Sequence, residues 1–196
     1  MSFFKRNFPI IVLALIPVAI AINIAIGQLI VVLKLPVYLD SIGTVLVGLL
    51  AGPWAGLVTG GLSNLIWGLS GLNPAYTPYF YVAAVIGLMA GIFAWLGWAK
   101  KWWLWLIGGL LTGVVAALIG APVTAYLYGG VTGSGTDLVV AVLRASGANV
   151  IQAAFGQGIV SDPIDKAVSY LIVWLIVIAL PRRFRARFPN ADRLPR

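Results

Sequence analysis

One apolar stretch, "DSIGTVLVGLLAGPWAGLVTGGLSNLIWGLSG", Asp40 to Gly71, is compatible either with one long helix or with two short antiparallel helices. The sequence "AGPW", Ala51 to Trp54, interrupts it. Pro53 has no backbone N–H and disfavours helix in the residue before it, while Gly52 tolerates the backbone angles of a tight turn. We therefore predict a helical hairpin with its turn at this sequence.

The chain as a whole is strongly apolar. Hydrophobic residues make up 61% of it, charged residues only 9%, and the mean hydropathy is +1.03. Soluble domains carry about 25% charged residues. The apolar runs are distributed along the chain, and several approach the roughly 20 residues with which a helix crosses a bilayer. These properties predict an all-α integral membrane protein with a single membrane domain, residues 1–196.

The breaks between the apolar runs predict a six-helix transmembrane bundle. The expected helices have the approximate bounds 8–33, 40–51, 54–71, 79–98, 102–128 and 163–181. Both termini then lie on one side, and an excess of Lys and Arg identifies that side as cytoplasmic. In this orientation ten basic residues lie inside, including Lys5, Arg6 and the basic tail 182–196, and three lie outside. A single crossing by 40–71 would turn the tail outward, against this bias.

Two further patterns concern packing. Gly48, Gly52, Gly56 and Gly60 recur at intervals of four, which gives a helical face on which another helix packs closely. The segment 129–161 is too polar for a lipid-facing helix and too apolar for a free loop. We expect it to form a partly helical outer lid between helices five and six, next to an outward-facing cavity.

Polar and aromatic residues near the outer end are the candidates for solute binding. In "SDPIDKAVSY", Ser161 to Tyr170, Asp162 fits an N-cap and Pro163 the first helical position, so helix initiation explains them as well as solute binding does. For the aromatic residues, an interfacial belt is the alternative to a site for a flat ring. The candidates are Asp40, Trp67, Asn73, Tyr76, Tyr79, Arg144, Asn149, Gln152, Asp162, Asp165 and Lys166.

The residues that support most enzymatic chemistry are missing. The chain has no cysteine and no histidine, which excludes disulfides, thiolate or imidazole metal sites and histidine acid–base catalysis. No nucleophile–base pair, metal cluster or phosphate-binding glycine loop is evident. We expect no enzyme activity, no metal, no cofactor in this chain and no nucleic-acid partner, so any uptake it drives must use a partner's ATP or an ion gradient.

The segments "AINIAIGQLI", "LPVYLDSIGTVLVGLLAGPWAGLVTGGLSNLIWG", "GGVTGSGTDLVVAVL" and "SDPIDKAVSY" resemble the S component, the substrate-capturing membrane subunit, of energy-coupling-factor (ECF) vitamin transporters. The resemblance implies a multi-pass protein of a prokaryotic cell membrane that takes a small ring-containing vitamin or precursor from outside. It also implies partners: a T subunit and two ATPases that use ATP. In the family an AxxxA pattern in the first helix contacts the T subunit, and here Ala21, Asn23 and Ala25 match that region.

Two other classes of protein stay open. A ligand-sensing membrane module of a signalling system uses a similar bundle, and is expected to continue into a kinase, cyclase or phosphatase domain. A solitary ion-coupled carrier commonly shows two related halves, and no convincing internal repeat is present in this sequence.

Overall fold

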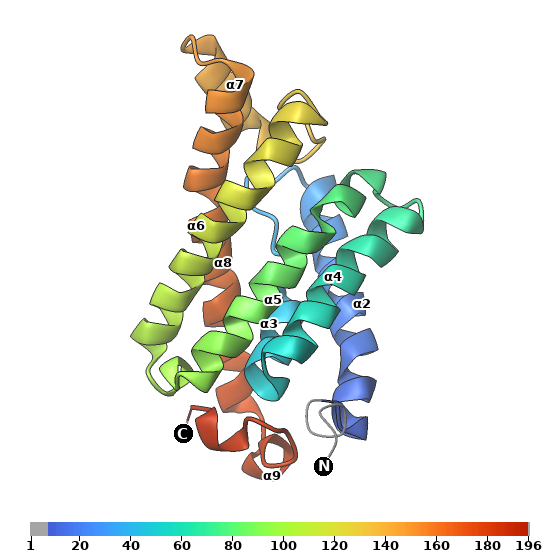
Figure 1. The fold of residues 1–196 in the computed structure, drawn as a ribbon, viewed down its shortest axis with the longest axis vertical. Helices are drawn as coiled ribbons and strands as arrows, with labels where there is room; N and C mark the ends of the chain where they lie inside the picture. Colours follow the sequence, from blue (N-terminus) through green and yellow to red (C-terminus); the bar gives the residue numbers. More distant parts are fainter. Residues whose placement is uncertain (1–7, 196) are drawn as a thin grey trace.

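The computed structural model describes residues 8–195 as a bundle of helices without a strand in that range (Figure 1). The main helices are α2 (Ile10–Val32), α3 (Ile42–Ala51), α4 (Pro53–Leu69), α5 (Phe80–Trp95), α6 (Trp102–Tyr126), α7 (Asp137–Ala145) and α8 (Val150–Ala179). Short helical turns are η1 (Pro74–Tyr79), η2 (Trp98–Lys100), α9 (Arg182–Arg185) and η3 (Ala191–Arg193). The prediction of an all-α protein is confirmed. Lys5, Arg6 and Arg196, which the predicted topology uses, lie outside the described residues.

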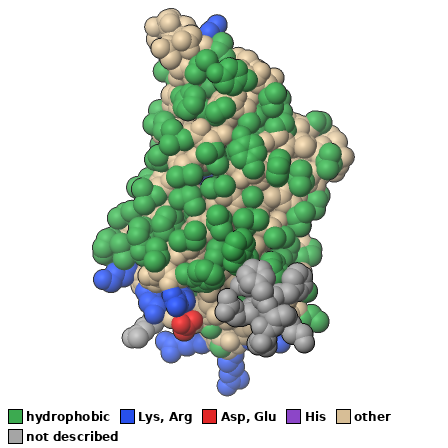
Figure 2. Space-filling model, in the orientation of Figure 1, with side chains coloured by type: hydrophobic (Ala, Val, Ile, Leu, Met, Phe, Trp, Pro, Cys, Tyr) green, Lys and Arg blue, Asp and Glu red, His purple; other side chains and the backbone are tan. Residues whose placement is uncertain are grey.

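The helices have the lengths and the surface of a membrane protein. Three segments, Ile10–Val32, Pro74–Trp95 and Trp102–Tyr126, are long and apolar enough to cross a bilayer. Figure 2 shows hydrophobic side chains over most of the visible face, while most of the visible Lys and Arg gather at one end. Comparison with Figure 1 shows that α9 and the start of α2 lie at this end, and that α7 lies at the opposite end.

The stretch 40–71 forms the predicted hairpin. Helix α3 ends at Ala51, Gly52 has φ +98°, and α4 begins at Pro53. The two helices run antiparallel and touch, because a Cβ added to Gly56 would lie 2.9 Å from the Cα of Gly48, and one added to Gly60 would lie 3.0 Å from the Thr44 methyl group. A glycine with a positive φ, followed by a proline, therefore reverses the chain at the predicted place.

The glycine face of α4 packs directly against α5, as predicted. A Cβ at Gly56 would lie 2.3 Å from the Gly87 carbonyl oxygen, and one at Gly60 would lie 2.0 Å from that of Ala83. No side chain fits into such gaps, so the absence of Cβ atoms brings these backbones together. Gly52 does not belong to this face, because it forms the turn.

Part of the C-terminal segment packs into the bundle. Pro53 has no N–H to donate to the Leu49 carbonyl, so the end of α3 leaves acceptors unsatisfied. Asn190 supplies the donors: its backbone N–H bonds to the Leu50 carbonyl at 3.1 Å and its side-chain amide to the Leu49 carbonyl at 3.0 Å. The tail thus caps the hairpin turn from the basic end of the molecule.

The start of the last helix was predicted wrongly. Helix α8 begins at Val150 rather than at residue 163, so Asp162 is not an N-cap and Pro163 lies inside the helix. The true cap is a reciprocal pair in which the Asn149 side chain accepts from the Gln152 N–H, and the Gln152 side chain accepts from the Asn149 N–H. This capping box satisfies the free N–H groups at the helix start, which is why the helix begins there. Residues 150–161, which were predicted to belong to the lid, form the first part of α8. Of the predicted lid segment, only α7 and its flanking loops lie outside that helix.

Candidate functional site

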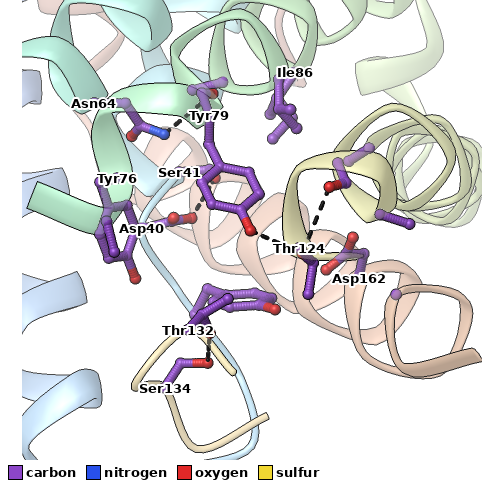
Figure 3. A pocket seen from close by; sticks show the side chains of 18 of the residues that line it. Asp40, Ser41, Asn64, Tyr76, Tyr79, Ile86, Thr124, Thr132, Ser134 and Asp162 are labelled. Atoms are coloured by element: carbon purple, nitrogen blue, oxygen red, sulfur yellow. Dashed lines mark hydrogen bonds between the residues drawn. The ribbon is translucent and has the colours of Figure 1, made fainter. Parts of the chain in front are cut away.

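A cavity lies between the ends of α3, α4, α5 and α6 that are remote from the basic tail, against the middle of α8 (Figure 3). Its volume is about 90 Å³. One water needs about 10–15 Å³ of such space, so the cavity holds several waters or one compact solute of ring size. The lining residues with polar or aromatic side chains are Tyr38, Asp40, Ser41, Asn64, Asn73, Tyr76, Tyr79, Thr124, Thr132, Ser134, Gln157, Asp162 and Lys166.

One wall is aromatic. Tyr76 in η1 stacks on the fully buried Trp67 of α4, with ring centroids 3.7 Å apart and an interplanar angle of 23°. The Trp67 indole N–H donates to the Gln28 side chain at 3.0 Å, and Gly27 has no Cβ that would collide with the indole ring. Tyr79 is held by a 2.7 Å hydrogen bond between its hydroxyl and that of Thr124. Trp67 therefore fixes Tyr76 from behind and does not itself line the cavity.

The other wall carries a charged network from the start of α3 and the middle of α8. The Lys166 ammonium donates to Asp165 at 2.6 Å, to the Ser41 hydroxyl at 2.9 Å and to Asp40 at 3.2 Å. The side chains of Lys166, Asp165 and Asp40 are only 4%, 0% and 14% exposed. Such a buried network persists only when each charge is paired and hydrogen-bonded.

Asp165 also fixes the loop before α3. Its second carboxylate oxygen accepts the backbone N–H groups of Tyr38 and Leu39, each at 2.8 Å. Leu39 has φ +49°, an uncommon conformation for a residue with a side chain, and these bonds hold it in place. The network therefore couples α8 to the loop that brings Tyr38 and Asp40 to the cavity.

Tyr38 joins the cavity to the loop before α7. Its hydroxyl is hydrogen-bonded to Thr136 at 3.0 Å and accepts from the Gln157 amide at 3.1 Å. Thr136 is in turn bonded to Ser134 at 2.7 Å. Burial raises the pKa of Tyr38 well above its ordinary value, so the hydroxyl stays neutral.

Asp162 differs from the other carboxylates. It lines the cavity from α8, and Figure 3 draws no hydrogen bond between it and the other lining residues. Within residues 8–195 its carboxylate also takes part in no ion pair. The Tyr76 hydroxyl is likewise buried without a hydrogen-bond partner in that range. These two groups are among those that the cavity offers to a solute.

The structure brings only some of the predicted site residues together. Those that line the cavity are Asp40, Asn73, Tyr76, Tyr79, Asp162 and Lys166, with Trp67 and Asp165 directly behind it. Arg144 is exposed on α7, and Asn149 and Gln152 are exposed and bonded to each other in the cap of α8. None of these three lines the cavity. For Asn149 and Gln152, the predicted start of the last helix was too late, so their role as the cap of α8 was not recognised.

The three residues predicted to contact a partner subunit do not share one environment. Ala21 and Ala25 are exposed on α2, whereas Asn23 is fully buried and hydrogen-bonded to Thr44 and Ser63. Asn23 as a partner contact was wrong. Residues two apart on a helix lie on nearly opposite faces, so Asn23 could not share the face of the two alanines.

Sequence reasoning missed Tyr38, Ser41, Thr124, Thr132, Ser134 and Gln157 as lining residues. A signal existed for α8, because Ala154, Gly158, Asp162 and Lys166 all line the cavity and recur every four residues. The period becomes visible once the helix begins at Val150. The residues from the loops before α3 and α7 carry no comparable periodic signal.

Comparison with known protein families, with curated proteins and with solved structures found no match. The fold and the site define a class: an all-α membrane protein with a ring-sized, mostly apolar cavity near one end of its bundle, whose wall carries several polar and charged groups.

Proposed function

We propose that this chain is the solute-capturing membrane subunit of an energy-coupling-factor importer, and that it takes up a small, water-soluble, ring-containing vitamin or precursor. One observation carries the proposal: Tyr76, which is stacked on Trp67 behind it, faces a cavity whose opposite wall offers hydrogen-bonding and charged groups. Ligand sites for ring compounds combine these elements, because the ring needs a flat apolar contact and its edge needs polar partners.

The proposed topology has six crossings, with the cavity in the outer half and both termini in the cytoplasm. Lys100 and Lys101 lie in and beside η2, close to the C-terminal segment, because Arg193 donates to the Trp95 carbonyl and the Trp174 indole to the Ala99 carbonyl. A basic end of this kind is expected on the cytoplasmic side. The loops before α3 and α7, together with α7, would then act as the lid on the outside.

Thiol labelling tests this topology, since the chain has no native cysteine. We expect an impermeant reagent to label Asn73→Cys and Ser134→Cys in intact cells and to leave Lys100→Cys unlabelled until the membrane is opened. Labelling of position 100 in intact cells would overturn the orientation.

Native mass spectrometry of the gently purified chain is the direct test of the function. We expect a ring-containing small molecule to be retained by the wild type and lost when Tyr76 is replaced by Ala. A lipid as the only specific ligand would contradict the proposal. Affinity purification from the native membrane should recover a T subunit and two ATPases, whereas a signalling partner would favour the sensor.

The solitary ion-coupled carrier is the second candidate, and Asp162 is the observation that favours it. Asp162 is half-buried, lines the cavity and has no ion-pair partner among the described residues. A carboxylate in such a position is what a carrier uses to bind a proton or a cation. Uptake by the purified chain alone in liposomes, driven by an ion gradient, would support the carrier, and uptake that requires the ATPases would support the importer.

A further inference from the structure

The charges around the cavity do not balance. Among the described residues that line or directly back it, three carboxylates, Asp40, Asp162 and Asp165, face a single ammonium, Lys166. Arg144 does not contribute, because it is exposed on α7 and does not line the cavity. While all three acids are ionised, the cavity carries an excess of negative charge, which is costly in a poorly hydrated site until a cation or a proton neutralises it.

Lys166 is not available to an incoming anion. An ammonium group has three N–H donors, and Asp165, Ser41 and Asp40 accept one each. A carboxylate or phosphate on the solute would therefore have to displace an internal partner. It would also have to approach Asp162, which has the same charge.

Among the carboxylates of the described residues that line the cavity, Asp162 and the second oxygen of Asp40 have no hydrogen bond. All hydrogen bonds to Asp40 use Oδ1, which leaves Oδ2 without one. Ionised carboxylates accept hydrogen bonds but do not donate them, so both groups would bind hydrogen-bond donors on the solute. In the view of Figure 3, Tyr76 and Asp162 lie on opposite sides of the Tyr79 ring, so the aromatic wall and the unpaired carboxylate line different sides of the cavity.

On the basis of the function proposed above, we infer that the solute is cationic, a ring that carries a protonated or permanently positive nitrogen, and that Asp162 is the residue that selects this charge. The ring packs against Tyr76, which Trp67 holds from behind, and the nitrogen pairs with the Asp162 carboxylate. The paired Lys166, Asp165 and Asp40 keep the loop before α3 in place and do not neutralise the solute. Asp162 thus acts as a specificity determinant and the other three charges as its scaffold.

Three probes of nearly the same size and shape test the inference: benzamidine, which is cationic, benzamide, which is neutral, and benzoate, which is anionic. Their binding to the purified full chain is measured by calorimetry in detergent. We expect benzamidine to bind at least tenfold more tightly than benzamide, and benzoate to bind most weakly. A hydrogen bond between charged partners is typically worth more than the roughly 1.4 kcal/mol that corresponds to tenfold in affinity.

Asp162→Asn removes the charge and keeps the shape of the side chain. We expect it to lose the preference for benzamidine over benzamide, while the matched control Asp192→Asn, in an acid that is 76% exposed near the C-terminus, keeps it. If Asp162→Asn does not fold, the order of the three probes on the wild type decides the inference by itself. Asp162→Glu, which retains the charge, should then preserve that order.

The outcomes separate this inference from the proposed function. If benzamide or benzoate binds as tightly as benzamidine, and Tyr76→Ala abolishes that binding, the ring site stands and the charge assignment is wrong. Benzamidine and benzamide should also bind equally tightly if Asp162 is protonated under the conditions of the measurement, because a neutral acid gives no preference for a cation. If no probe binds, or if Tyr76→Ala leaves all binding unchanged, the ring site and the charge assignment are both wrong.

Discussion

Two buried polar clusters in this bundle differ in how completely their groups are satisfied. In the first, Asn23 of α2 joins α3 and α4: its amide donates to the Thr44 hydroxyl at 2.8 Å and to the Ser63 hydroxyl at 2.9 Å, and its oxygen accepts from the Gly43 N–H at 2.7 Å. Both amide hydrogens and the oxygen are used. Nothing is left for a solute, so the cluster holds helices together.

In the second cluster, around the cavity, saturated and unsaturated groups stand side by side. Lys166 has all three donors engaged, and Asp165 uses both oxygens. Asp162 and the Tyr76 hydroxyl have no partner within residues 8–195. Burial and polarity alone therefore do not distinguish a structural residue from a binding residue in this bundle. An unpaired polar group that also lines a cavity does, because proteins seldom leave a buried polar group unpaired without a use for it. Ser169 Oγ and Arg185 Nε are also buried without a partner among the described residues, but neither residue lines the cavity.

Breaking the saturated part of the cavity cluster should have the largest effect on stability. Lys166→Met leaves Asp165 and Asp40 buried without their counter-ion, and we expect the free energy of unfolding to fall by about 3–5 kcal/mol. Thermal unfolding in detergent measures it, with Lys100→Met, at an exposed lysine, as the control. A loss no larger than that of the control would mean that water or a proton already compensates the acids.

The Asn23 cluster should respond to truncation with a smaller loss. Asn23→Ala leaves the Gly43 N–H without its side-chain acceptor and removes the donors to Thr44 and Ser63, and a buried group left unpaired costs about 1–3 kcal/mol. The same unfolding measurement tests this. Affinity for benzamidine in the folded fraction should not change. If affinity fell as much as stability, the two clusters would not be functionally separate.

The two clusters also show how far the sequence could be used for prediction. Apolar run length, together with Gly52 and Pro53, located the helices and the hairpin, because both signals are local along the chain. The face of Asn23 was also predictable, since it follows from the helical period alone. Its assignment as a partner contact was an error of reasoning and not a lack of information.

The start of α8 and the pairing of charges were harder to predict. Asp162–Pro163 and Asn149–Gln152 are both good helix starts locally, and only packing decides between them: Pro163 lies where α8 meets α6, with its Cα 2.3 Å from the position of a Cβ on Gly113. Likewise, Asp40 and Lys166 are 126 residues apart in sequence. Which carboxylate takes the lysine and which stays unpaired is set by tertiary contacts, which a single sequence does not contain.

Asp162→Asn should affect stability far less than Lys166→Met, although the two residues are one helical turn apart. Among the described residues Asp162 has no hydrogen-bond or ion-pair partner, so neutralising it breaks no bond. It removes the cost of burying a charge and the repulsion from Asp165 and Asp40, which together exceed the lost attraction to Lys166. We expect the unliganded protein to be unchanged or up to about 1 kcal/mol more stable. Thermal unfolding without added probe measures this. If Asp162→Asn lost about as much stability as Lys166→Met, Asp162 would have an internal partner, and the distinction between a paired Lys166 and an unpaired Asp162 would be wrong.

The smallest effect on the isolated chain is expected outside both clusters, on the exposed face of α2. Ala21→Leu with Ala25→Leu enlarges two side chains that are exposed, so stability should stay within about 0.5 kcal/mol of the wild type and benzamidine affinity should not change. If the proposed assembly is right, the property that should change is binding of the T subunit, because two leucines fill the face on which the proposed partner helix needs small residues to approach closely. Co-purification of the T subunit should fall sharply, while Leu29→Ala, at an exposed position nearer the end of the same helix, keeps it. Unchanged co-purification would remove this face as the partner contact. A loss of stability would instead show that Ala21 and Ala25, like Asn23, belong to the packed interior.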